Sequence, residues 1–298
     1  MKWALVLSGG GAKGLTYIGM LKAFEELGIE KPSLVVGCSI GAIIGAIYAL
    51  GKPISELETF FTHNYNPTYY LGSNVTTPFK TLNTIINTTH VMTNIVNGKS
   101  LDDGKKLYAL FQKLTDNKQF SETSIPFLCN ALDVYTGNEI VLSEGELAKA
   151  ILASSAYPIA FPPVSIGEHL LVDGGASNNC PVWIAKKYRK GKVLSVTLSK
   201  FNKNERGNYS NLISLVMRIT ACVFNNIKLE KKDFPDFWLD LSSDIPTTDF
   251  YNPEKKIQLG YELTMAKKDS LLKFFKPGFM GFLSRMQTKN YIKKNYTI

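Results

Sequence analysis

Buried strands alternate with apolar helices over the first fifty residues. Residues 3–7 and 34–36 are short runs of branched and aromatic apolar residues, which is typical of strands covered on both faces. Apolar residues recur at helical spacing from Leu15 to Leu27, and small apolar residues fill Ile40 to Leu50. This β-α-β-α order predicts an α/β fold with a mostly parallel central sheet and helices on both faces.

The pattern beyond residue 120 predicts two hairpins, further strands and a helical end. A turn at residues 135–138 and another at residues 167–169 each separate two short apolar runs. Further strands are predicted at Pro126–Leu132, Asn138–Leu142, Val164–Ile166, Leu170–Val172, Lys192–Leu198 and Asp236–Leu241, and helices at Ser55–Phe61, Leu107–Leu114, Glu146–Ser155, Leu212–Lys228 and Pro253–Lys273.

We expect one domain over residues 1–298. Its core motifs lie within residues 1–198, and residues 200–298 form a more helical C-terminal part. Residues 55–120 interrupt the α/β rhythm with an Asn- and Thr-rich run, which predicts either a cap over the site or a peripheral insertion.

Composition is that of a protein that buries a core, with 45% hydrophobic residues in 298. Its four cysteines are scattered without a CxxC pair, which favours reduced thiols over disulfides or a zinc site. We read no signal peptide and no apolar run near the ~18 residues of a membrane span, so we expect a cytoplasmic protein.

Most of the net charge of +9 lies near the C-terminus. Residues 252–298 hold ten Lys/Arg and three Asp/Glu, a net of +7. The segment following Leu271 also mixes phenylalanines with lysines. Such a segment suits a docked or solvated tail, or attraction to anionic lipid headgroups or nucleic acid.

Gly37-x-Ser39-x-Gly41 stands between the second strand and the second helix. In this context Gly-x-Ser-x-Gly predicts a nucleophile elbow, a sharp strand-to-helix turn that exposes a strained serine. Glycine on both sides leaves room for the neighbouring strand and helix. The serine hydroxyl would lie at a helix N-terminus, where the helix dipole favours developing negative charge.

A glycine turn follows the first strand. Gly9-x-Gly11-x-x-Gly14 matches the dinucleotide fingerprint, but the second strand ends in the serine elbow and not in an acidic residue. Backbone N–H groups at a helix N-terminus can instead receive an oxyanion. We therefore favour an oxyanion hole over a nucleotide site.

The serine needs a base, and histidines are scarce. The chain has only His63, His90 and His169, and none follows Asp173. Asp133 with His169 would satisfy the Ser-acid-His order, although His169 falls in a predicted hairpin turn. Asp173, at a strand end before two glycines, is the favoured partner of Ser39 by elimination.

Four blocks resemble the patatin-like phospholipase family, its bacterial members in particular. They are the glycine turn Gly9–Gly14, the elbow Gly37–Gly41, residues 153–163 with their Ser-Ser-Ala-Tyr-Pro start, and Asp173-Gly174-Gly175. The resemblance covers residues 3 to about 198. Lys13 stands where many members have arginine.

The resemblance implies a three-layer α/β/α fold and a serine acyl hydrolase with a Ser-Asp dyad. Ser39 would be the nucleophile, Asp173 the general base, and the N–H groups of Gly9, Gly10 and Gly11 the oxyanion hole. Supporting glycines would be Gly14, Gly37, Gly41, Gly174 and Gly175. We expect an acyl-ester or phospholipid substrate, peripheral contact with an anionic membrane through the basic C-terminal segment, and no metal, cofactor or nucleic-acid partner.

Three other functions remain open at this stage. An acyltransferase would use the same acyl-serine with an alcohol or thiol acceptor. A non-catalytic lipid-binding protein would keep the scaffold without its chemistry, although both Ser39 and Asp173 are present. A nucleotide-binding protein would use the glycine turn for phosphate.

Overall fold

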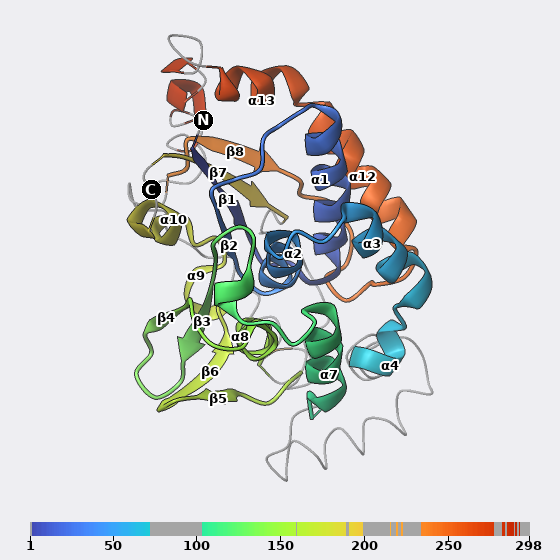
Figure 1. The fold of residues 1–298 in the computed structure, drawn as a ribbon, viewed down its shortest axis with the longest axis vertical. Coiled ribbons are helices and arrows are strands. Elements are labelled where there is room, and N and C mark those ends of the chain that lie inside the picture. The colour runs from blue at the N-terminus through green and yellow to red at the C-terminus, as the bar shows by residue number, and fades with distance from the viewer. Residues whose placement is uncertain are drawn as a thin grey trace.

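An eight-stranded mixed sheet runs through the described part of the chain (Figure 1). The structure is a computed structural model that describes residues 2–71, 103–158, 160–188, 191–198 and 234–276, and in addition residues 215, 219, 222, 282–283, 285–288, 290 and 292. The strands are β1 (Trp3–Leu7), β2 (Leu34–Gly37), β3 (Phe127–Asp133), β4 (Glu139–Leu142), β5 (Val164–Ile166), β6 (His169–Asp173), β7 (Lys192–Thr197) and β8 (Phe237–Asp240).

The sheet joins a parallel part to two antiparallel hairpins. Its strand order is β5-β6-β3-β2-β1-β7-β8, with β4 paired to β3. Pairings are parallel from β3 through β2, β1 and β7 to β8. They are antiparallel between β3 and β4, β3 and β6, and β5 and β6. Both predicted hairpins and the predicted α/β fold class are thus confirmed.

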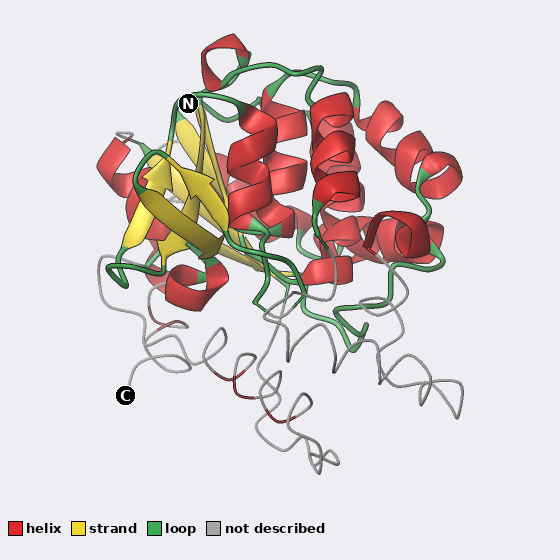
Figure 2. Ribbon diagram, turned by 90° about the horizontal axis from the view of Figure 1, so that it is seen from below, coloured by secondary structure: helices red, strands yellow, loops and turns green. Residues whose placement is uncertain are grey.

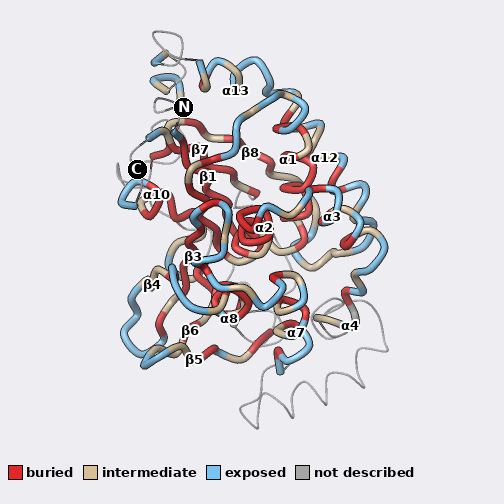
Figure 3. Tube along the Cα trace, in the orientation of Figure 1, coloured by how far each residue is buried: buried red, intermediate tan, exposed pale blue. Residues whose placement is uncertain are grey.

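Helices cover both faces of the sheet (Figure 2). Residues alternate along β1, so Trp3, Leu5 and Leu7 enter the larger core while Ala4 and Val6 enter a smaller one beside α10. Buried residues concentrate along the central strands and the helices next to them (Figure 3). The helices are α1 (Thr16–Glu26), α2 (Ile40–Ala49), α3 (Ile54–Thr59), α4 (Pro67–Leu71), α7 (Lys105–Leu114), α8 (Leu147–Ser154), α9 (Gly175–Asn178), α10 (Val182–Tyr188), α12 (Pro253–Met265) and α13 (Lys268–Phe275), with 3₁₀ turns η1 (Gly11–Leu15) and η3 (Phe120–Glu122) and a π-turn η2 (Phe60–Asn64).

The predicted single helix Pro253–Lys273 is wrong. The N–H of Lys267 donates to the carbonyl of Thr264, which tightens the last turn of α12, and α13 then starts in a new direction (Figure 1). This change of direction buries Leu271 and Phe274 completely. The Phe274 ring lies 5.3 Å from that of Phe237 on β8. The start of the aromatic C-terminal segment is therefore docked on the protein body.

Two other predicted segments are described only in part. Of the predicted cap over residues 55–120, α3, η2, α4, α7 and η3 are described, while residues 72–102 lie outside the described part. Most of the predicted helix Leu212–Lys228 also lies outside it. Among the helices described, none is both long enough and apolar enough to span a membrane.

Candidate active site

The glycine turn and the serine elbow leave the sheet at the same point. β1 and β2 are parallel neighbours in which Leu7 pairs with Gly37, the last residue of each strand. The N–H of Cys38 donates to the carbonyl of Leu7 at 3.0 Å. A Cβ added to Gly9 would lie 3.1 Å from Cβ of Ser39. The two turns therefore lie side by side at the same edge of the sheet.

Ser39 has the strained backbone of a nucleophile elbow. Its φ of 53° and ψ of −122° lie outside the regions that residues with side chains favour, and it occupies the N-cap position of α2 without a side-chain capping bond. A Cβ on Gly37 would overlap the carbonyl of Gly41, and a Cβ on Gly41 would overlap the carbonyl of Leu7. Both glycines are therefore required for steric reasons, as the sequence predicts.

Strand β6 delivers Asp173 to the end of β2. On β3, Cys129 pairs with Gly37 and Ala131 pairs with Asp173, while β4 pairs with both of these β3 residues from the other edge. Strands β2 and β6 consequently share one edge of β3 and run head-on toward each other. Their meeting point brings Asp173 beside the elbow across more than 130 residues of sequence.

The side chains of Ser39 and Asp173 form a short hydrogen bond. The hydroxyl of Ser39 donates to Oδ2 of Asp173 at 2.6 Å, and the N–H of Gly175 donates to Oδ1 at 2.8 Å. Asp173 is 1% exposed. Burial raises the pKa of Asp173 to about 6, and the hydrogen bonds from Ser39 and Gly175 oppose this rise. A carboxyl with this pKa can exchange protons near neutral pH.

Two residues that the sequence did not single out support this pair. The N–H of Ser39 donates to Oγ of Ser154 at 3.0 Å, which places the end of α8 against the elbow. The amide of Asn130 donates to the carbonyl of Asn178 at 2.8 Å and to that of Gly174 at 3.4 Å. A Cβ on Gly174 would overlap the carbonyl of Asn130. Only the position of Ser154 within a recognised block could have indicated its role.

The glycine turn offers two of the three expected backbone donors. The N–H of Gly9 donates to the carbonyl of Asn179 at 3.1 Å, so this group is already engaged and the expectation for Gly9 does not fit this conformation. Within the described residues, the N–H groups of Gly10 and Gly11 have no acceptor. Lys13 reaches away from the turn and donates to the carbonyl of Ser243 at 2.9 Å.

The remaining predicted residue of the turn, Gly14, packs against the elbow helix. A Cβ there would overlap the side chain of Ile40, the first residue of α2. The turn and the elbow are therefore in contact behind the site as well as beside Ser39.

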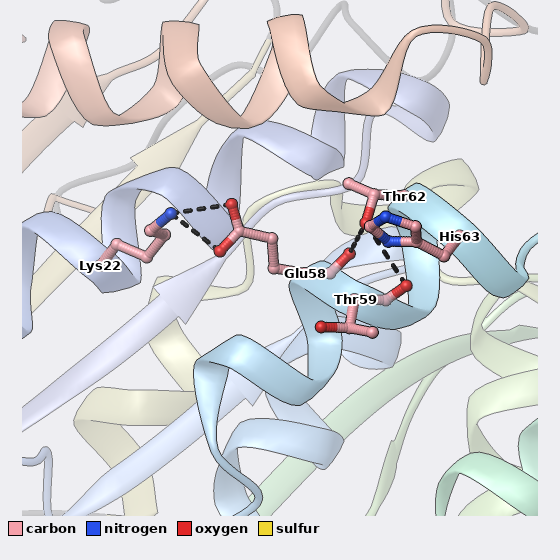
Figure 4. A network of polar contacts seen from close by, with 5 residues as sticks. All are labelled: Lys22, Glu58, Thr59, Thr62 and His63. Atoms are coloured by element: carbon pink, nitrogen blue, oxygen red, sulfur yellow. Dashed lines mark hydrogen bonds and ion pairs between the residues drawn. The ribbon is translucent and has the colours of Figure 1, made fainter.

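The described histidines serve other contacts. His63 in η2 lies 2.6 Å from Oγ1 of its neighbour Thr62, in a network with Lys22 and Glu58 (Figure 4). His169 is the first residue of β6 and not part of the turn, and its Nδ1 lies 3.1 Å from Oδ2 of Asp133.

The Asp133–His169 pair lies too far along β6 to act on Ser39. His169 and Asp173 occupy opposite ends of this strand, about 13 Å apart at ~3.3 Å per residue. His90 lies outside the described residues. In the described ranges, no group of three His, Cys, Asp or Glu side chains is arranged to hold a metal ion.

Comparison with known proteins extends this picture. The family described as patatin-like phospholipase matches residues 5–186. The chain is 29% identical over 213 residues to human "Patatin-like phospholipase domain-containing protein 6", covering 71% of this chain and 14% of that protein. It is also 29% identical over 215 residues to "Lysophospholipase NTE1" of Cryptococcus neoformans, covering 70% of this chain and 12% of that protein. The chain thus spans about a seventh or less of these relatives.

A solved structure shares the fold. VipD from Legionella pneumophila superposes with a TM-score of 0.52 at 16% identity, over 90% of this chain and 67% of that one. At this identity the likeness concerns the fold alone. The family match covers more than half of the 298 residues and spans the glycine turn, the serine elbow and the strand that carries Asp173. The chain therefore belongs to the patatin-like phospholipase family.

Proposed function

We propose that this protein is a serine acyl hydrolase that works through Ser39 and Asp173. The 2.6 Å hydrogen bond from the Ser39 hydroxyl to the buried Asp173 carboxylate carries the proposal. The hydrogen bond gives the serine proton a direct path to a base, and the helix N-terminus at Ser39 favours negative charge on its oxygen.

The reaction follows in two halves. In the first, Asp173 takes the proton of Ser39 while Oγ attacks the carbonyl carbon of the ester. The N–H groups of Gly10 and Gly11 stabilise the resulting oxyanion. Collapse of this intermediate breaks the bond to the alcohol, which leaves with the proton held by Asp173, and an acyl-Ser39 ester remains.

The second half returns the enzyme to its starting state. Asp173 removes a proton from water, and the hydroxide attacks the acyl-serine carbonyl. The tetrahedral intermediate collapses with release of the carboxylic acid, and Ser39 recovers its proton from Asp173. No other co-reactant is needed, because water supplies both the oxygen and the hydrogen atoms.

Hydrolysis of a p-nitrophenyl acyl ester tests the dyad. Ser39→Ala and Asp173→Asn should each lower kcat by about 10³-fold or more. The matched control is Asp133→Asn, which alters an equally buried aspartate on the same sheet and removes the alternative base pair with His169. Full activity of either dyad variant, or loss of activity in folded Asp133→Asn alone, would contradict the assignment.

We further propose a phospholipid or lysophospholipid as the acyl ester. Two relatives are a phospholipase domain protein and a lysophospholipase by name, which supports this substrate class. Release of fatty acid from lysophosphatidylcholine, phosphatidylcholine and triacylglycerol distinguishes the classes. Preference for triacylglycerol over both phospholipids would argue against the proposal.

Contact with an anionic lipid surface through residues 252–298 is also proposed. Their net charge of +7 would attract such a surface. Sedimentation with phosphatidylserine-containing vesicles should exceed that with phosphatidylcholine vesicles and should weaken as salt is raised. Equal binding to both kinds of vesicle would exclude a role for the charge.

A further inference from the structure

The backbone of Gly9 is held on both sides by neighbouring groups. Its N–H donates to the main-chain carbonyl of Asn179 at 3.1 Å. Its carbonyl accepts from the side-chain amide of Asn179 at 3.4 Å and from the hydroxyl of Ser8 at 3.1 Å. The backbone of Gly9, the glycine beside the nucleophile, therefore takes part in three hydrogen bonds, which restrain its conformation.

These bonds determine where the next N–H points. In a trans peptide the carbonyl and the following N–H lie in opposite directions. With the Gly9 carbonyl directed at Ser8 and Asn179, the Gly10 N–H points away from both. Because glycine has no side chain, the Gly9–Gly10 peptide could otherwise rotate easily and present an acceptor where the oxyanion needs a donor.

The two restraining side chains are themselves fixed. Oδ1 of Asn179 lies 3.9 Å from the thiol of Cys38, and the same side chain fills the space beside Gly9, where an added Cβ would overlap Oδ1. Ser8 is 1% exposed, and its hydroxyl lies 3.2 Å from that of the fully buried Tyr17. Asn179 directly follows the short helix α9 after Asp173, so it links the glycine turn, the elbow and the base-bearing segment.

We propose that Asn179 and Ser8 are positioning residues of the oxyanion hole: they hold the Gly9–Gly10 peptide so that the Gly10 N–H faces the reacting oxygen. The inference rests on the proposed acyl-hydrolase function. Neither residue touches the reacting atoms, and both act through one peptide group.

Replacing the carbonyl oxygen of the substrate tests this role. A p-nitrophenyl ester and its thiono analogue, in which sulfur replaces the carbonyl oxygen, are compared by kcat/KM per active site, with sites counted by a fluorophosphonate titrant. Sulfur is the poorer hydrogen-bond acceptor, so wild type should prefer the oxygen ester. In Asn179→Ala and Ser8→Ala we expect the rate with the oxygen ester to fall roughly 10- to 100-fold, short of the ~10²–10³ lost with a whole donor.

The ratio of the two rates separates positioning from mere structural support. A misdirected donor lowers kcat/KM for the oxygen ester more than kcat/KM for the thionoester. The ratio of the oxygen-ester value to the thionoester value should therefore drop about tenfold in both variants. The control is Asn178→Ala, which removes an equally half-buried asparagine whose side chain accepts from the N–H of Cys180 at 3.2 Å; its ratio should stay at the wild-type value.

Three outcomes distinguish failure of the positioning role from failure of the proposed hydrolase function. A reduced ratio in Asn179→Ala or Ser8→Ala, with Asn178→Ala unchanged, supports the positioning role. An unchanged ratio in both variants overturns it while leaving the dyad intact, and Ser8→Ala keeps the test open if Asn179→Ala does not fold. Absence of ester hydrolysis in wild type, or full activity of Ser39→Ala, overturns the proposed function itself.

Discussion

At the scale of single residues, the site combines strain and burial. Ser39 has a positive φ in the sharp turn between β2 and α2, which is possible because Gly37 and Gly41 let the backbone segments around it approach closely. This conformation presents its hydroxyl at the start of α2. Asp173 is buried, and among the described residues its carboxylate accepts hydrogen bonds from the Ser39 hydroxyl and the Gly175 N–H, together with a weak contact from Cys38. The carboxylate is therefore a stronger base than an exposed aspartate.

Activity should depend on the ionisation of Asp173. Because the base must be deprotonated and burial raises the pKa of Asp173 to about 6, kcat/KM should fall about tenfold per pH unit below this value and level off above it. The measurement is fatty-acid release from pH 4.5 to 8.5. A profile that stays flat down to pH 4.5 would show that Asp173 does not act as the base.

The same burial should reduce stability. The native pKa of Asp173 lies above the unfolded value of about 3.9, so the native state binds more protons between pH 4 and 6 and stability declines as pH rises through this window. Asp173→Asn removes the buried charge and should raise the free energy of unfolding by up to ~3 kcal/mol at pH 8, with little gain below pH 4. Urea denaturation at both pH values measures this, and a gain that is equal at both would contradict the explanation.

At the scale of elements, local sequence patterns predicted the helices, strands and turns but not all of the tertiary contacts between them. The apolar runs, the two hairpin turns and the elbow glycines were readable because each depends on neighbours in sequence. The engagement of Gly9 by Asn179 was not, since it joins residues 170 positions apart through the fold. The break between α12 and α13 was also missed, because helical spacing continues across it and only tertiary packing decides the direction.

Helices α1 and α12 cross at two glycines. A Cβ on Gly19 would overlap the carbonyl of Ile257, and one on Gly260 would overlap the carbonyl of Thr16. Both obstacles are backbone atoms, so relief requires the helices to move apart. Thr16 directly follows η1, which contains the end of the glycine turn, so separation of these helices would disturb the site as well.

Gly260→Ala should therefore destabilise the protein by about 2 kcal/mol or more, despite the better helix propensity of alanine. Thermal unfolding measures the effect. Gln258→Ala on the exposed face of the same helix is the control and should change stability by less than about 0.5 kcal/mol. Equal melting temperatures for Gly260→Ala and wild type would show that the two helices are not packed this closely.

At the scale of the whole molecule, the described residues after the family match belong to the same sheet and to the helices packed on it. Strand β8 extends the sheet next to β7, and α12 packs on α1 (Figure 1). The connection between β8 and α12 reaches the glycine turn, where the carbonyl of Thr247 accepts the N–H of Ala12 at 2.8 Å. The C-terminal part thus contacts the glycine turn and helps to hold it in place, a role that its weak family resemblance did not indicate.

Docking of α13 should contribute to global stability. Leu271 is fully buried, whereas its neighbour Leu272 is only half-buried. We expect Leu271→Ala to lower the free energy of unfolding by about 2–5 kcal/mol and the matched Leu272→Ala to lower it by clearly less. Denaturant unfolding of both variants tests this. Similar small effects would mean that α13 is free for other contacts.

Reaction with a fluorophosphonate probe, followed by peptide mapping, tests the central claim most directly. An activated serine attacks the phosphorus and retains the label. We expect one label per chain, on Ser39, with none in Ser39→Ala and a much slower reaction in Asp173→Asn. Labelling of any other residue in the wild-type protein, or rapid labelling of Asp173→Asn, would contradict the Ser39–Asp173 site.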